Sequence, residues 1–246
     1  MQRNQKGQNG PSLSPILIPK ASDILASQLR DMIVNGHLRP GDFLPAERQL
    51  VAESGISRTS VRDALRILES EGLVTTKVGR SGGSIVTLPA REAVARSVEL
   101  FVRTHGIRME SLLDCRVAVE PTLAQLAAEN RTESQLAEMT ELHAEFASAA
   151  DNVQRYKAAN LDWHLCVARA SGNEPLIAFM EAISEAIRDA MEYKHTTTPA
   201  IRAEAIKAHG VILDAIRQQD GESAFKRMSR HVVAYRSVAF PRKKTA

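Results

Sequence analysis

From residue 91 to residue 240 the apolar residues recur only at helical spacing. About seven helical patterns are separated by short breaks, near residues 106, 130–132, 150–151, 171–173, 196–199 and 220–221. Thr132 and Gln135 have the spacing of a capping box at one of these helix starts. Because the breaks are short, we expect sequential helices to pack antiparallel as a bundle.

The chain before Pro89 follows a different pattern. Three helices and then two strands are expected, over residues 20–34, 45–54, 57–71, 73–78 and 84–88. Pro45 fits the first turn of the second helix, and Ser57 is a good N-cap for the third. We therefore divide the chain into a disordered tail (1–19), a first domain (20–89), an all-helical domain (90–240) and a basic tail (241–246).

Composition narrows the class of protein. Hydrophobic residues are 43% and charged residues 25%, as is ordinary for a soluble globular chain. No apolar run approaches the ~18 residues of a transmembrane helix, and the polar N-terminus does not resemble a secretory signal. The two cysteines, Cys115 and Cys166, cannot make a disulfide framework, so we expect reduced thiols, a cytoplasmic location and no membrane partner. A net charge of +3 does not by itself identify a nucleic-acid binder.

The segment between residues 44 and 72 has the order of a helix-turn-helix. Gly55 in its turn permits the backbone conformation that lets two helices cross steeply. The second helix begins with small hydroxyl residues and two arginines, Arg58 and Arg62, and its apolar residues come later. In such motifs this end enters the major groove, where hydroxyls bind phosphate and arginine reads guanine. The two strands that follow, with a glycine-rich tip at 79–83, look like a wing.

These features also have a purely structural interpretation, in which Arg58 and Arg62 form a solvated face and residues 79–83 are a hairpin turn. A nucleotide phosphate loop is disfavoured because no Gly-Lys-Ser/Thr opens a following helix. Residues 20–90 hold nine Lys/Arg and eight Asp/Glu. Basic residues therefore hardly outnumber acidic ones in this domain, and only their positions could favour DNA. Composition leaves both interpretations open.

The order of motifs favours the DNA-binding interpretation. The residues that carry it are Gly36, Leu38-Arg39-Pro40-Gly41, Leu44-Pro45-Ala46-Glu47-Arg48-Gln49-Leu50, Gly55-Ile56-Ser57-Arg58-Thr59-Ser60-Val61-Arg62-Asp63-Ala64-Leu65 and Leu68-Glu69-Ser70-Glu71-Gly72-Leu73-Val74. Together they resemble the winged helix-turn-helix of the GntR family of bacterial transcription regulators. The fold class expected for the whole chain is mainly α: a winged helix-turn-helix followed by an all-helical antiparallel bundle.

The resemblance implies contacts with double-stranded operator DNA. Arginines would touch DNA, hydroxyl residues would contribute to bases or phosphates, and one glycine would sit at the wing tip in the minor groove. The residues so assigned are Arg48, Ser57, Arg58, Thr59, Ser60, Arg62 and Gly79. Some relatives carry a histidine just before that glycine, where this chain has Val78. The resemblance therefore assigns no side-chain contact at position 78.

Three of the seven histidines have spacings that suit a metal site. His164 lies within a helical pattern, with Asn160 one turn earlier on the same face. His209 and His231 lie eleven residues before and eleven after Asp220, so an antiparallel hairpin centred there would place both imidazoles at the same height. Three imidazoles and one oxygen ligand would suit Zn²⁺, Ni²⁺ or a related divalent ion.

The structural alternative is that each histidine is a surface or core residue. We interpret the remaining histidines in that way: His37, His105, His143 and His195. Cys166, two residues from His164, points away from a shared site and is expected to be a buried core thiol. An apolar stripe at residues 176, 180, 183, 187 and 191 indicates core or a subunit interface rather than a cofactor site.

The helical domain also carries a family resemblance. The matching residues are Arg116-Val117-Ala118-Val119-Glu120-Pro121, Leu126-Ala127-Ala128, Asn160-Leu161-Asp162-Trp163-His164, Ala170-Ser171-Gly172-Asn173, His209, Ala215-Ile216, Asp220, Met228 and His231. They resemble the FCD effector domain of the FadR branch of GntR regulators. That resemblance implies a metal site made by Asn160, His164, His209 and His231. An amide is a weaker ligand than the carboxylate found in some relatives, which implies a lower metal affinity.

By the same resemblance, the metal and Arg116 hold the carboxylate of a small organic acid effector. Arg188 and Tyr235 are further candidates, Tyr235 because it lies one turn beyond His231. The alternative for Arg116 is a structural salt bridge with Glu120, one turn away.

The leading hypothesis is a homodimeric, ligand-responsive transcription regulator, expected to act as a repressor and not as an enzyme. One alternative is a DNA-binding regulator that needs no ligand. Another is a metal-dependent hydrolase with an accessory nucleic-acid domain, in which Glu120 or Asp162 would be the general base. No HExxH or similar motif supports the hydrolase.

Overall fold

The computed structural model describes residues 18–77, 82–190 and 198–240. The chain divides into two compact units, residues 1–89 and 90–246. The proposed tails fall almost entirely outside the described residues, and so do Gly79, proposed for the wing tip, and His195.

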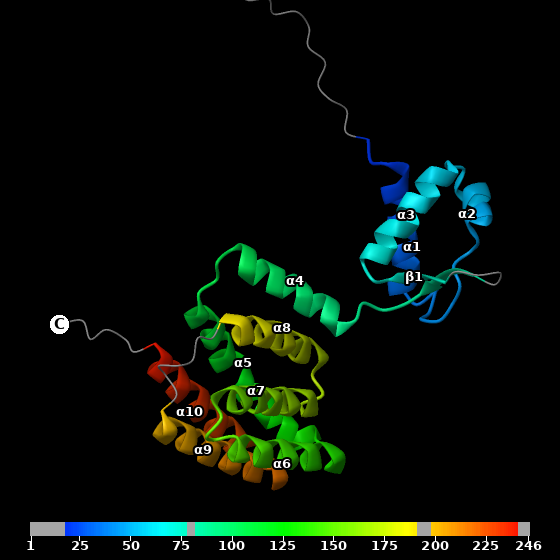
Figure 1. The fold of residues 1–246 in the computed structure, drawn as a ribbon. Helices are drawn as coiled ribbons and strands as arrows, with labels where there is room; N and C mark the ends of the chain where they lie inside the picture. The colour runs from blue at the N-terminus through cyan, green and yellow to red at the C-terminus, as the bar shows by residue number, and fades with distance from the viewer. Residues whose placement is uncertain (1–17, 78–81, 191–197, 241–246) are drawn as a thin grey trace, which may run out of the picture. The chain divides into compact units, whose positions relative to one another are not determined.

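The first unit has three helices and a two-stranded antiparallel sheet (Figure 1). Its elements are α1 (Ala21–Val34), α2 (Glu47–Ser54), α3 (Arg58–Ser70), β1 (Val74–Lys77) and β2 (Gly83–Val86). Val74 pairs with Val86, and Phe43, which lies before α2, forms an isolated bridge with Ile85. Helix α2 begins later than predicted: Ala46 is its N-cap and is extended, so Pro45 lies before the helix rather than in its first turn.

One apolar cluster holds this first unit together. Leu29 of α1, Leu50 of α2 and Leu68 of α3 meet at its centre with Val74 and Val86 of the sheet, and all are buried. These residues recur at helical spacing on their helices, so one stripe of each helix faces the cluster. The opposite face of α3, which carries the arginines, is left exposed.

Seven helices make up the described part of the second unit, which confirms the all-helical prediction. They are α4 (Arg91–Thr104), α5 (Met109–Asn130), α6 (Glu133–Ser148), α7 (Val153–Ala170), α8 (Glu174–Ala190), α9 (Pro199–Arg217) and α10 (Gly221–Ala239). Thr132 and Gln135 form the predicted capping box before α6. Asp220 caps α10 by accepting a hydrogen bond from the backbone N–H of Ser223.

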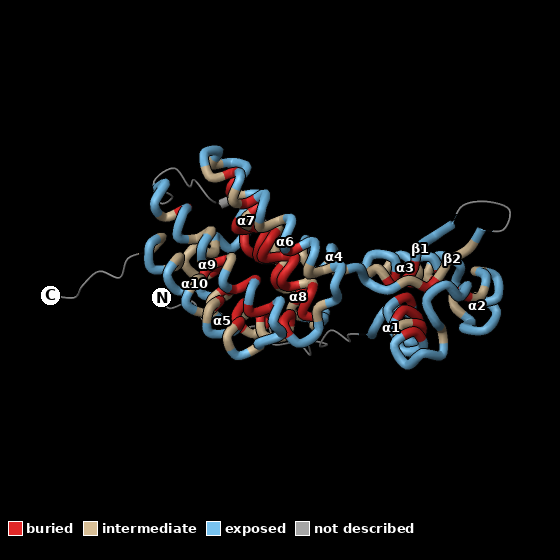
Figure 2. The backbone as a smooth tube through the Cα atoms, turned by 90° about the horizontal axis from the view of Figure 1, so that it is seen from below, coloured by how far each residue is buried: buried red, intermediate tan, exposed pale blue. Residues whose placement is uncertain are grey.

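Helix α7 lies at the centre of this unit. It packs against α5, α6 and α8, and its C-terminal half is almost continuously buried (Figure 2). The rule that short connections pair neighbours holds for α6 with α7 and for α9 with α10. It does not describe α4, which packs mainly on α8, or α5, which packs mainly on α10. Both partners lie far along the chain. Connection length limits where a helix can go, but matching apolar faces decide which partner it covers.

Several smaller predictions about the second unit are confirmed. Met180, Ile183 and Ile187 of the apolar stripe on α8 are buried core residues. Cys166 is a buried thiol, and burial raises its pKa to about 12. None of the described helices is long and apolar enough to cross a membrane.

The capping box at Thr132 gives a direct test of how local sequence fixes this fold. Replacing Thr132 by alanine removes an N-cap acceptor, so we expect the free energy of unfolding to fall by about 1 kcal/mol. Thr140→Ala is the matched control, because Thr140 lies within the same helix and only donates to the carbonyl of Leu136. Urea unfolding of both variants measures the effect. Equal losses from the two substitutions would contradict the capping role.

Candidate functional site: a recognition helix and a buried histidine cluster

The turn between α2 and α3 sets the angle of the exposed helix face. Gly55 has a φ of +70°, a left-handed conformation that glycine adopts without strain. Ser57 then caps α3, its hydroxyl accepting from the N–H of Ser60 at 3.1 Å. The hydroxyl of Ser57 is therefore used in capping the helix. Its oxygen also lies 3.0 Å from the hydroxyl oxygen of Ser60.

The arginines predicted to touch DNA all lie at the surface. Arg48, Arg58 and Arg62 are exposed, as is Thr59. Arg62 forms an ion pair with Glu47 of α2 at 2.9 Å, so part of its charge is held by a neighbouring helix. An exposed pair of this kind contributes little to stability and can be exchanged for a phosphate or a base edge.

In the second unit, the hairpin of α9 and α10 brings His209 and His231 together. Their Nε2 atoms lie 3.1 Å apart, as the equal spacing about Asp220 predicts. His164 of α7 joins them, and one ring nitrogen from each of the three lies within 4.8 Å of the others. His164 and His209 are buried, and His231 is partly exposed.

Aromatic rings hold His209 in place. Trp163 stacks on it with ring centroids 4.1 Å apart, and Phe146 also stacks on it at 4.5 Å. Trp163 and Phe146 are fully buried, so the imidazole has little freedom to turn. This packing aims Nε2 of His209 at His231.

Burial keeps the three imidazoles neutral at physiological pH. Desolvation lowers the pKa of His209 well below its ordinary value of 6.5, and the neighbouring histidines lower it further. The pKa of His231 falls to about 3, because burial, His164 and Arg116 all disfavour its charged form. The pKa of His164 is also lowered by burial, although Glu120 opposes that effect. Neutral imidazole is the form that binds metals.

The geometry of the cluster fits a divalent metal ion. Two nitrogens bound tetrahedrally to one Zn²⁺ at about 2.0–2.1 Å would lie about 3.3 Å apart. The separation of 3.1 Å between His209 and His231 is close to that value. Nε2 of His164 is buried and has no hydrogen-bond partner within the described residues, so a cation would satisfy it.

A buried carboxylate connects this cluster to Arg116. Glu120 forms an ion pair with Nε of Arg116, one turn away on α5, which is the pairing considered from the sequence. Its other oxygen lies 2.6 Å from Nδ1 of His164. Burial alone would raise the pKa of Glu120, but Arg116 and His164 outweigh it and the pKa is lowered. A carboxylate held ionised in this way is a weak base, which disfavours its role as the general base of a hydrolase.

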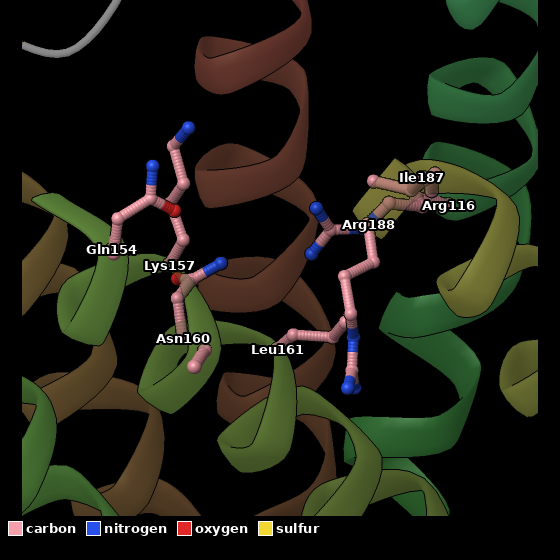
Figure 3. Close-up of a pocket in the computed structure, with 8 residues that line it drawn as sticks. Arg116, Gln154, Lys157, Asn160, Leu161, Ile187 and Arg188 are labelled. Atoms are coloured by element: carbon pink, nitrogen blue, oxygen red, sulfur yellow. The ribbon is translucent and has the colours of Figure 1, made fainter. Parts of the chain in front are cut away.

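Arg116 also faces a small cavity of about 240 Å³. Figure 3 shows Gln154, Lys157 and Asn160 on one side of it, along α7, and Arg116 with Arg188 on the other. Three of these residues are cationic, and none of the described residues that line the cavity is acidic. A guanidinium nitrogen of Arg188 lies 3.7 Å from a carboxylate oxygen of Asp162. Asp162 is half-exposed and is not among the residues that line the cavity. The volume is below the 300–1,000 Å³ typical of pockets for drug-sized ligands, so it suits a small anion.

Tyr235 lies on a different opening. It lines an apolar groove of about 610 Å³ along α9 and α10, which His231 also lines. Its ring centroid is 6.0 Å from the guanidinium carbon of Arg116. The structure therefore brings Arg116, Arg188 and Asn160 to one cavity and places Tyr235 near Arg116 but in a separate opening.

The other histidines that the structure describes lie outside the cluster. His37 and His105 are exposed, and His143 is partly buried near Gly210. Sequence reasoning missed Gln154 and Lys157 as cavity residues. Their spacing could have indicated this, because Gln154, Lys157 and Asn160 recur every three residues and therefore share one helix face.

Comparison with protein families now identifies the two units. The model of the bacterial regulatory proteins of the gntR family matches residues 21–82, and the FCD domain model matches residues 111–234, half of the chain. The chain belongs to the GntR family, in the branch with an FCD domain. The GntR match covers the helix-turn-helix, and the FCD match covers all three clustered histidines.

Individual relatives agree with this assignment of a GntR-family regulator. The chain is 29% identical over 214 residues to the uncharacterized HTH-type transcriptional regulator YieP of Escherichia coli, covering 83% of this chain and 89% of that one. It is 25% identical to the HTH-type transcriptional repressor NanR of Edwardsiella tarda over 228 residues, 89% and 85% of the two chains. Its fold resembles Streptococcus agalactiae GntR, with a TM-score of 0.62, 19% identity and coverage of 87% and 98%.

The neutral histidines predict how stability depends on pH in the metal-free regulator. The unfolded chain protonates imidazoles near pH 6.5, whereas folded His209 and His231 resist protonation because their pKa values are lowered. The unfolded state therefore binds more protons below pH 6.5, and stability falls by up to about 1.4 kcal/mol per pH unit for each such group. Urea unfolding of chelator-treated protein at pH 7.0 and pH 5.5 measures this loss.

His231→Asn is the matched variant for that measurement, because it removes one of the resisting groups and should make the pH dependence shallower. The same pH dependence in the variant and the wild type would contradict the prediction.

Proposed function

We propose that this GntR-family protein is a homodimeric repressor whose affinity for operator DNA is controlled by a small organic acid bound beside a divalent metal in the helical unit. The observation that carries the proposal is the contact chain from the cationic cavity to the histidine cluster. Arg116 lines the cavity and pairs with Glu120, and Glu120 in turn touches His164. A ligand that binds Arg116 therefore lies next to the residues that would hold the metal.

His164, His209 and His231 would hold Zn²⁺ or Ni²⁺, and Asn160 would add an oxygen ligand. Asn160 lies one turn before His164 on α7 and lines the cavity, which supports its assignment to both the metal and the ligand. The metal when bound would supply a Lewis-acidic position for an oxygen of the effector. The residues of this chain do the rest of the binding.

The cavity favours an effector with a carboxylate and further polar groups. Arg116 and Arg188 offer guanidinium groups, which bind carboxylates through two parallel hydrogen bonds. Lys157 and Gln154 add donors on the opposite side, which suits hydroxyl or carboxylate oxygens along a short chain. A small hydroxy acid or sugar acid therefore fits better than a fatty acid.

DNA binding is assigned to the N-terminal end of α3 and to Arg48. Arg58, Thr59 and Arg62 are exposed there, in the first turns of α3, where a helix start attracts phosphate. A homodimer would present two such helices to a near-palindromic site. The name of NanR as a repressor supports the direction of regulation.

The first experiment tests the effector site. Wild-type protein loaded with Zn²⁺ is unfolded thermally with a panel of small carboxylic, hydroxy and sugar acids. A ligand at a hundredfold excess over its Kd stabilises the folded state by about 2.7 kcal/mol. We expect at least one acid to raise the melting temperature of wild type but not of His231→Ala, while the control His143→Ala keeps the shift. No shift with any acid, and no bound metal, would leave a regulator that needs no ligand.

The second experiment tests the recognition helix. A duplex selected by wild-type protein from a random-sequence pool serves as the probe, at fixed salt. Arg58→Ala should weaken binding by about 1–3 kcal/mol, which is about 5- to 150-fold, because an arginine that reads a base edge is lost. Arg217→Ala removes an exposed arginine of the helical unit and should leave binding unchanged. Equal affinities for Arg58→Ala and wild type would remove Arg58 from the interface.

A further inference from the structure

The buried Glu120 has a geometry that neither a plain salt bridge nor the histidine cluster explains alone. Its side chain is 3% exposed, and its two oxygens face different partners on two helices. One oxygen pairs with Arg116 of α5, and the other lies 2.6 Å from Nδ1 of His164 of α7. Removing this carboxylate from water is costly, so its retention next to the cluster calls for a purpose beyond packing.

The contact determines which nitrogen of His164 remains for a metal. Because Nδ1 lies 2.6 Å from the carboxylate, Nε2 is the nitrogen that remains for a metal. Both ring nitrogens are buried, and neither makes a hydrogen bond of ordinary geometry within the described residues. A metal-binding histidine commonly gives its second N–H to a carboxylate, which fixes the ring orientation and makes the imidazole a better ligand.

Arg116 makes this arrangement possible. A carboxylate at this depth needs a positively charged partner beside it, and the guanidinium of Arg116 is that partner. Nε of Arg116 donates to one carboxylate oxygen of Glu120. That hydrogen bond fixes the carboxylate so that its other oxygen faces α7. The cluster is therefore oriented by residues of a helix that contributes no histidine to it.

We propose that Glu120 is a positioning residue that holds His164 with Nδ1 toward α5 and Nε2 toward the metal. The inference rests on the proposed metal site but names a residue outside the ligand set. It assigns to Glu120 a share of the metal affinity, transmitted entirely through His164.

The test measures Zn²⁺ affinity by competition with a chromophoric chelator at pH 7.5, with the full chain. Glu120→Gln removes the charge, and we expect it to weaken Zn²⁺ binding by about 10- to 100-fold, the usual effect of losing a carboxylate behind a metal-binding histidine. Glu129→Gln makes the same change at an exposed position of the same helix and should bind as wild type does.

Glu120→Gln leaves Arg116 buried without its ionised partner, and an uncompensated buried charge can by itself unfold the variant. The double variant Arg116→Met/Glu120→Leu replaces the ion pair by apolar groups, a change that folded proteins often tolerate. It should melt near the wild-type temperature yet bind Zn²⁺ at least as weakly as Glu120→Gln. In ¹⁵N spectra of the metal-free protein, the Nδ1–H form of His164 should dominate in wild type and lose that preference in the double variant.

The outcomes separate the two proposals. Wild type that binds no Zn²⁺ overturns the metal site and this inference together. Wild type that binds Zn²⁺, with a folded double variant of equal affinity and an unchanged His164 tautomer, overturns the role of Glu120 and leaves the metal site in place. Weakened binding by Glu120→Gln or the double variant, with Glu129→Gln unaffected, supports both.

Discussion

The helical unit is built around one buried negative charge. The carboxylate of Glu120 must be compensated where it lies, and its partners come from different helices, Arg116 from α5 and His164 from α7. Loss of one partner from a buried pair typically costs about 3–5 kcal/mol, because the other charge is left uncompensated. The register between α5 and α7 is therefore restricted by chemistry as well as by the fit of apolar side chains.

The rest of the cluster is constrained by ring packing instead of charge. Trp163 and Phe146 fix His209, and the hairpin of α9 and α10 brings His231 to it. Neutral imidazoles can be buried at modest cost, whereas protonated ones facing each other cannot. The same burial that stabilises the fold thus prepares three nitrogen donors in the protonation state that a metal requires.

Much of this could be predicted from the sequence, because local rules govern it. Helical periodicity predicted the seven helices of the second unit, and the equal spacing of His209 and His231 about Asp220 predicted their meeting. Short connections did not predict that α4 covers α8 or that α5 runs along α10, since partner choice depends on faces far apart in the chain.

The histidine site could likewise be predicted where local spacing governs it, but not where helices far apart in the chain meet. The spacing of Arg116 and Glu120 made their ion pair one of two alternatives for Arg116, but nothing local to α5 indicates that the second oxygen of Glu120 meets α7. Gln154 and Lys157 were overlooked because a polar stripe on a helix is usually a solvated face. The packing of α5 and α8 opposite them turns that face into a cavity wall.

The shared carboxylate also has a consequence for divergence within the family. A single substitution at Arg116, Glu120 or His164 would strand a charge or an unpaired polar atom in the interior, so each position is held by the other two. Substitutions at these three positions are then expected to occur together rather than one at a time. A descendant that abandons the metal would exchange the arginine and the glutamate together for apolar residues, and the histidine could vary freely only afterwards.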